Sequence, residues 1–198
     1  MLQRRISLNR LFGILLFLLL QASFCSSFAS ESTEDIKQKA YALYATKNFN
    51  EAANLLKSLP ASEKNEEVFL ILANIAEENF NYNLAIQNLN KALDKNYSYY
   101  KAYYNLGCIL AKKKSYILAM NNFELAVKYN KNFASAYYNL ACCQMQLKNY
   151  SAAKKNLIKA IELEPNIKDA YYNLALCYKE LNKIKQAQKL LKTYESLS

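Results

Sequence analysis

The word Ala-Tyr-Tyr-Asn-Leu occurs three times in this 198-residue chain, at positions 102–106, 136–140 and 170–174. Consecutive copies begin 34 residues apart, and a fixed period of roughly 20 to 50 residues is typical of proteins built from stacked repeats. A single unit of this size cannot bury its apolar face alone, so it is stable only against its neighbours. The period therefore predicts an array of similar units rather than one closed core.

Within each unit, apolar residues recur at helical spacing in two successive stretches. In the unit that begins at residue 134 these residues are Tyr137, Leu140, Ala141, Tyr150, Ala153, Leu157 and Ala160. Turn-forming residues at 130–132 and 164–166 separate this unit from its neighbours. Because the chain contains only 2 Gly and 2 Pro, strands joined by tight turns are not expected. The predicted fold class is all-α, with two helices in each unit.

This pattern resembles the tetratricopeptide repeat. That family has a 34-residue helix–turn–helix unit with an aromatic, Leu, small, aromatic, Ala, aromatic, Ala, Pro order. The unit at residue 134 fits the order and ends at Pro165, with Leu157 in place of the usual aromatic residue and Gln144 as a departure. The resemblance implies a right-handed superhelical solenoid whose concave side is lined by the first helix of each unit.

Two further units precede the first copy of the word. One begins near Phe69, one period before Tyr103. The other is degraded and begins near Thr33, where Ser32 and Asp35 form a capping-box-like start, and Pro60 ends it. We therefore expect about five tetratricopeptide-like units within residues 31–198. The expected ranges are about 33–65, 66–99, 100–133, 134–167 and 168–198.

Residues 1–30 are predicted to be a targeting segment. Three Arg precede an apolar run at 11–20, and small residues follow, which is the form of a secretory signal peptide. Cleavage is expected after Ala29 or Ser30. Two alternatives stay open, retention of the segment as a membrane anchor and lipid attachment at Cys25. All three predict an exported chain that is periplasmic, secreted or membrane-anchored facing away from the cytoplasm.

Composition argues against several classes of function. The chain has no His, which excludes a His-based catalytic triad, a His general base and a His metal ligand. Its Cys residues lack the CxxC spacing of zinc sites and redox motifs. The net charge is +10, yet all three Arg lie in residues 1–10, whereas nucleic-acid recognition favours Arg. We predict a protein that is not an enzyme and has no cofactor, no metal and no nucleic-acid partner.

The second Tyr and the Asn of the repeated word are not required by helix packing, because they face away from the side of Tyr103 and Leu106. We expect them to form two parallel ladders on the concave side. In the family, Asn residues on this side can hold the main chain of an extended peptide, and aromatic residues add apolar contact. The alternative is that both residues belong to the repeat scaffold. The predicted peptide-binding residues are Lys101, Tyr104, Asn105, Cys108, Tyr138, Asn139, Cys142, Tyr172 and Asn173.

The predicted function is a scaffold for protein–protein interaction in the cell envelope or secretory compartment. Its partner is another protein, bound through an extended segment in the concave groove. The alternative is a self-assembling or membrane-tethered structural spacer that uses the last helix, at 182–197, or the Lys-rich surface. Membrane association through the N-terminus and the oligomeric state stay open.

Overall fold

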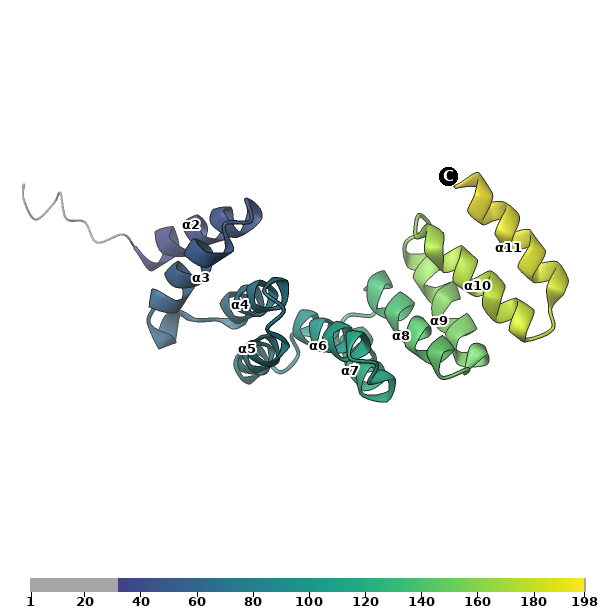
Figure 1. The fold of residues 1–198 in the computed structure, drawn as a ribbon, viewed down its shortest axis with the longest axis horizontal. Coiled ribbons are helices and arrows are strands. Elements are labelled where there is room, and N and C mark those ends of the chain that lie inside the picture. Colours follow the sequence, from purple (N-terminus) through teal and green to yellow (C-terminus); the bar gives the residue numbers. More distant parts are fainter. Residues whose placement is uncertain (1–31, 198) are drawn as a thin grey trace, which may run out of the picture. The chain divides into compact units, whose positions relative to one another are not determined.

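The computed structural model describes residues 32–197, and all regular structure in this range is helical. The helices follow one another as packed pairs (Figure 1), which confirms the all-α class. Two compact units meet in sequence at Leu59 and Pro60. The α-helices are α2 (Thr33–Ala45), α3 (Phe49–Ser58), α4 (Glu66–Glu78), α5 (Tyr82–Lys95), α6 (Tyr100–Lys112), α7 (Tyr116–Tyr129), α8 (Ala134–Gln146), α9 (Tyr150–Leu163), α10 (Lys168–Glu180) and α11 (Ile184–Ser196), with a 3-10 helix, η1 (Ala61–Glu63), after α3.

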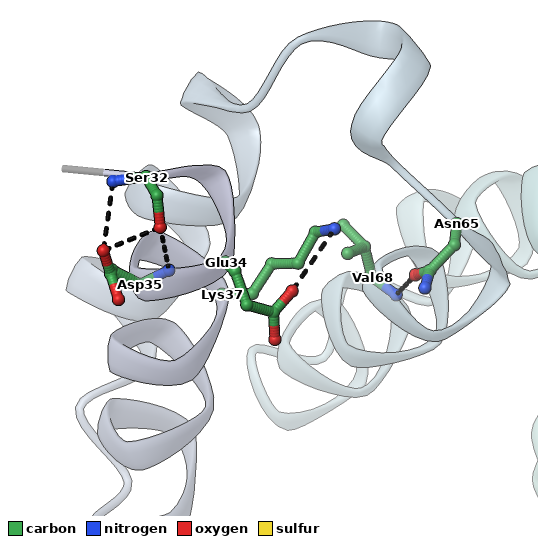
Figure 2. A network of polar contacts seen from close by, with 6 residues as sticks. All are labelled: Ser32, Glu34, Asp35, Lys37, Asn65 and Val68. Carbon is green, nitrogen blue, oxygen red and sulfur yellow. Dashed lines mark hydrogen bonds and ion pairs between the residues drawn. The ribbon is translucent and has the colours of Figure 1, made fainter. Parts of the chain in front are cut away.

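The described part of the first unit is the pair α2–α3. α2 begins with the capping box that the sequence predicts. The Asp35 N–H donates to Ser32 Oγ at 3.1 Å, and the Ser32 N–H donates to the Asp35 carboxylate at 3.2 Å (Figure 2). A further hydrogen bond from the Ser32 hydroxyl holds the pKa of the Asp35 carboxyl below its usual value. α3 ends at Ser58, two residues before Pro60.

The second unit contains α4 to α11, arranged as four helix pairs in one register. The turn inside each pair contains one non-glycine residue with φ between 57° and 59°, and these residues are Phe80, Lys114, Lys148 and Asn182. The four positions are 34 residues apart, so the turns repeat at the period of the repeated word. The first α-helix of the unit is α4, which begins where Asn65 Oδ1 accepts a hydrogen bond from the Val68 N–H (Figure 2).

Small residues in the first helices face large residues in the second helices. A Cβ placed on Gly107 would lie 2.6 Å from the Phe123 ring, so glycine is required at this position while the ring is present. One period later the same two positions are Ala141 and Leu157, both fully buried. A larger residue on the first helix is therefore matched by a smaller one on the second.

Three residues of the repeated word serve the packing of their own repeat. The Ala of each copy is fully buried, and the Leu is at most 8 % exposed. The first Tyr ties its helix to the preceding loop in two copies. The Tyr103 hydroxyl donates to the Tyr97 carbonyl, and the Tyr171 hydroxyl donates to the Pro165 carbonyl, each at 3.0 Å. The second Tyr and the Asn have another role.

Candidate functional site

The second Tyr and the Asn of the word bond to each other across neighbouring repeats. Asn139 Nδ2, in α8, donates to the Tyr104 hydroxyl of α6 at 3.0 Å and lies 3.7 Å from Cys108 Sγ. The same contacts recur one period later, at 3.1 and 3.6 Å, between α10 and α8. We name the two sets the first polar triad and the second polar triad, and they are Tyr104–Cys108–Asn139 and Tyr138–Cys142–Asn173.

Aromatic packing fixes the position of the first polar triad. The Tyr104 ring centroid lies 5.8 Å from that of Phe123 and 4.8 Å from that of Phe133. Burial raises the pKa of Tyr104 to about 12 and also lifts the pKa of Tyr138 well above its usual value. Both hydroxyls are therefore uncharged at neutral pH, and each can accept a hydrogen bond from the Asn of the next repeat.

The junction between α4 and α6 uses different side chains. Asn105 Nδ2 donates to Asn74 Oδ1 at 2.7 Å, and Lys112 Nζ lies 2.6 Å from Glu77 Oε1. The chain has Leu70 where the later repeats have the second Tyr. No Tyr hydroxyl is available at this position, so the two amides pair directly.

The second Tyr of the last copy of the word, Tyr172, has no Asn of a following repeat to bond to within residues 32–197. Tyr172 is 43 % exposed, whereas its equivalents Tyr104 and Tyr138 are half-buried. Its ring packs instead against Tyr194 of α11, with 5.4 Å between the centroids.

A pocket of about 390 Å³ lies among α6, α7 and α8 and includes two members of the first polar triad. Both N–H groups of the Asn139 amide are engaged in that triad, so its carbonyl oxygen is its remaining hydrogen-bonding atom. The pocket thus combines aromatic and thiol surface with a few polar groups. It is lined by Cys108, Ala111, Lys112, Tyr116, Phe123, Asn139, Cys142, Cys143 and Gln146.

The thiols of this region are not activated. The four Cys of the described chain are free. Burial raises the pKa of Cys108, Cys143 and Cys177 to about 11 and raises that of Cys142 above its usual value. These thiols are protonated at neutral pH, so they serve as small apolar groups and weak hydrogen-bond acceptors rather than as nucleophiles.

Residues 32–197 contain neither a metal-binding cluster nor a helix that could cross a membrane. No group of three or more His, Cys, Asp or Glu in that range is placed to hold a metal ion. None of the helices there combines the length and the apolar character that crossing a membrane requires. The predicted targeting segment, at 1–30, lies outside the described residues.

The structure brings together most of the residues that the sequence assigns to peptide binding. Six of them form the two polar triads, and Asn105 forms the amide pair with Asn74. Lys101 is exposed at the start of α6. Tyr172 belongs to the last copy of the word and is also exposed. The structure adds the bonds among these side chains, while their role in peptide binding stays a prediction.

Several residues of the pocket were not among the predicted site residues. Gln146 follows Cys142 by one helical turn on the same face of α8, so helical spacing alone is a signal for it. Tyr116 and Phe123 come from the second helix α7. Their place in the pocket depends on how α7 crosses α6 and α8, and the sequence pattern contains no signal for that.

Comparison with known families identifies the repeat. Family models described as tetratricopeptide repeat match residues 100–133, 134–167 and 157–189. The chain therefore contains tetratricopeptide repeats, as the resemblance indicated. No curated protein sequence matches the chain.

Solved structures with the same fold cover most of the described chain. A crystal structure of MamA has a TM-score of 0.72 at 24% sequence identity and covers 80% of this chain and 93% of that one. MamA residues 41–end from Desulfovibrio magneticus RS-1 has a TM-score of 0.73 at 21% identity, covering 83% and 94%. The C-terminal part of a tetratricopeptide-repeat protein from Cytophaga hutchinsonii has a TM-score of 0.72 at 20% identity, covering 96% and 74%. At these identities the likeness concerns the fold alone.

The chain is thus an all-α solenoid of tetratricopeptide repeats. This fold implies a scaffold for protein–protein interaction, and proteins with it generally bind other proteins and generally are not enzymes. The fold alone does not determine which surface binds a partner or what that partner is. Both have to be inferred from the side chains of this chain.

Proposed function

We propose that the chain is a non-enzymatic interaction scaffold of the cell envelope or secretory compartment that binds an extended segment of another protein along its first helices. The observation that carries the groove proposal is the pocket among α6, α7 and α8. Its volume of about 390 Å³ lies in the range of ligand pockets, about 300 to 1,000 Å³. Tyr116 gives it an aromatic wall, with the buried Phe123 beneath the surface, which suits an apolar side chain of the bound segment.

The polar triads define how the groove meets a peptide main chain. Asn139 and Asn173 use their N–H groups within the protein. Their carbonyl oxygens have no hydrogen-bond partner among residues 32–197, so they offer acceptors to main-chain N–H groups of a ligand. The two Asn lie on neighbouring first helices, which are separated by about 8 to 10 Å in packed helices. In an extended chain with polyproline II geometry, which has three residues per turn, N–H groups three residues apart point the same way and lie about 9 Å apart, so they match the two Asn.

Export is the part of the proposal that rests on the sequence of residues 1–30. Arg-rich, apolar and small-residue segments follow one another there. N-terminal sequencing of the protein from fractionated cells tests this part. A chain that begins near Ser30 or Glu31 outside the cytoplasm supports it, and a chain that begins at Met1 in the soluble cytoplasm contradicts it.

Selection from a random peptide library tests groove binding. Ala111 lines the pocket and takes no part in the polar triads, so Ala111→Lys fills the pocket without breaking an inter-repeat bond. Peptides selected on the wild-type protein should bind Ala111→Lys at least about tenfold more weakly, which corresponds to about 1.4 kcal/mol. The matched control is Ala45→Lys, the same change at an exposed position on the first helix α2.

The outcomes separate the groove from other surfaces. Binding that is weakened by Ala111→Lys and unchanged by Ala45→Lys supports the proposal, provided that both variants melt like the wild type. Peptides that bind all three proteins equally, or a selection that enriches no peptide, contradict it.

Self-assembly through the last helix is the second candidate. A hollow of about 610 Å³ lies along α11, lined by Lys185, Gln188, Lys189, Leu191, Lys192 and Glu195, and Ile184 is 50 % exposed. Sedimentation of the purified chain over a range of concentrations tests this candidate. A dimer that Ile184→Lys dissociates supports it, and a monomer at every concentration rules it out.

A further inference from the structure

Exposed apolar side chains of the second unit gather at one edge of the repeats. Phe80 is 79 % exposed, Ile117 65 % and Leu118 55 %. All three belong to the turns inside helix pairs, between α4 and α5 or between α6 and α7, or to the first turn of the helix that follows. Leu84, in the first turn of α5, is also exposed. Contiguous exposed apolar surface of this kind marks a site of contact with a protein or a membrane.

The two turns lie next to each other. The Nζ of Lys112, at the end of α6, lies 2.6 Å from Glu77 Oε1, near the end of α4. The residues that follow these helix ends are therefore neighbours, and Leu84 and Leu118 occupy equivalent positions one period apart. We name this surface the turn patch, and it consists of Phe80, Leu84, Lys113, Lys114, Ile117 and Leu118.

Equivalent positions in the other repeats show that folding does not require these residues. The left-handed position that holds Phe80 is Lys or Asn in every other described pair. The position of Ile117 is Asn83, Ser151 or Lys185 in the other pairs of the second unit. A turn of this geometry is thus built with polar residues elsewhere in the same chain, so the turn itself does not require the apolar side chains of Phe80 and Ile117.

Charge identifies the kind of surface that the turn patch fits. Lys113 and Lys114 are exposed beside Ile117 and Leu118, and the next turn adds Lys148 beside the 42 %-exposed Leu147. Glu77 is paired with Lys112, which leaves Glu78 as the acid of this turn. Protruding apolar side chains flanked by Lys match the interface of an anionic lipid bilayer, where the apolar groups enter the headgroup region and the Lys side chains meet lipid phosphates.

The opposite edge of the same repeats differs. The loops that join one pair to the next, at 96–99, 130–133 and 164–167, contain one strongly exposed large apolar side chain in the described second unit, Tyr97 at 73 %. Tyr97 also accepts the hydrogen bond of Tyr103 through its carbonyl. The opposite edge can therefore serve as a control for the turn patch within the same molecule.

We propose that the turn patch docks the second unit onto an anionic membrane surface. This site is distinct from the groove proposed for peptide binding, so the two proposals fail independently. The patch orients the repeats with the turn between α6 and α7 toward the lipid.

A single tryptophan tests the orientation, because the chain has no Trp of its own. The reporters are Ile117→Trp in the turn patch and Tyr97→Trp at the opposite edge, each in the full chain. Both replaced side chains are mostly exposed, and circular dichroism and melting confirm that each variant folds. Phe80→Trp serves as a second patch reporter. Each protein is mixed with vesicles of phosphatidylcholine alone, or with phosphatidylglycerol added, with and without brominated acyl chains.

The expected result is a shift of the Ile117→Trp emission to shorter wavelength and its quenching by brominated lipid, with anionic vesicles only. The Tyr97→Trp emission should stay unchanged. Adding Lys113→Glu and Lys114→Glu to the Ile117→Trp protein should weaken vesicle binding by at least about tenfold. A chain held at the membrane by residues 1–30 brings both edges near the lipid, so the difference between the two reporters carries the test.

Four results overturn the proposal. These are no change at Ile117→Trp and Phe80→Trp, equal changes at both edges, equal changes with neutral vesicles, or a change that soluble poly-glutamate produces and vesicles do not. The last result would assign the turn patch to an acidic protein instead.

Discussion

The junctions between repeats fall into two kinds. Between α4 and α6 an amide pair and the ion pair of Lys112 with Glu77 join the first helices. Between α6 and α8, and again between α8 and α10, the polar triads join them, with Tyr hydroxyls and thiols that burial keeps protonated. The same 34-residue register is thus held by a part-buried amide pair and an exposed ion pair at one junction, and by half-buried neutral groups at the other two.

The two kinds of junction show what the second Tyr and the Asn of the repeated word do. Where the word is present in two successive repeats, its second Tyr and its Asn meet across the junction. Where the earlier repeat has Leu70 in place of the Tyr, the junction relies on Asn74 and on an ion pair at the surface. The two kinds of junction should therefore respond differently to mutation, to pH and to salt.

The largest expected effect comes from Tyr104→Ala. It removes a half-buried ring that packs on Phe123 and Phe133 and leaves Asn139 without its oxygen acceptor. The free energy of unfolding should fall by about 2 to 3 kcal/mol, less than the roughly 3 to 5 of a fully buried Phe. Urea denaturation measures it. Tyr172→Ala, in the last copy of the word, should lower the free energy of unfolding by about 1 kcal/mol or less. Equal losses in the two variants would contradict the role of the first polar triad.

Gly107→Ala should cost about 1 to 3 kcal/mol, because the new methyl group collides with the Phe123 ring. Adding Phe123→Leu recreates the pair Ala141 and Leu157 of the next repeat. The double variant should therefore be more stable than Gly107→Ala alone, as thermal melts would show. A double variant that is weaker than Gly107→Ala would mean that the repeats do not share one packing rule.

The sequence predicted this fold well and the site only in part. Helical spacing and the 34-residue period are local signals, and the structure confirms the helix pairs that they predict. Helical spacing also placed Tyr104 and Asn139 on one side of the array. It could not show that they bond to each other, because that bond depends on how far α8 is shifted along α6. The α7 side of the pocket, with Tyr116 and Phe123, escaped prediction for the same reason.

Alkaline pH should weaken the junctions that contain thiols. The pKa of the Cys108 thiol is raised to about 11 in the folded chain, against about 8.5 in an unfolded one. The folded state therefore holds more protons between these values, and stability that is complete below about pH 8.5 falls as the pH rises toward 11. Melting temperatures from pH 7 to pH 11 measure the decline. Cys108→Ala with Cys142→Ala should make it shallower, and an unchanged decline would contradict the assignment.

The smallest effect is expected at the ion pair. Lys112→Ala should lower the free energy of unfolding by about 0.5 kcal/mol at low salt, and the difference should vanish near 1 M salt, where the Debye length is about 3 Å. Tyr104→Phe is the comparison, because its loss should be the same at both salt concentrations. A Lys112→Ala effect that is independent of salt would show that Lys112 acts through packing.

The most direct measurement is a double-mutant cycle on the first polar triad. Tyr104→Phe and Asn139→Ala, made singly and together, should show a coupling energy of about 0.5 to 1.5 kcal/mol, the net contribution of one hydrogen bond. The control cycle pairs Tyr104→Phe with Asn173→Ala, which belongs to the second polar triad, and should give a coupling near zero. Equal coupling in the two cycles, or none in either, would contradict the claim that the Tyr and Asn of the repeated word join neighbouring repeats.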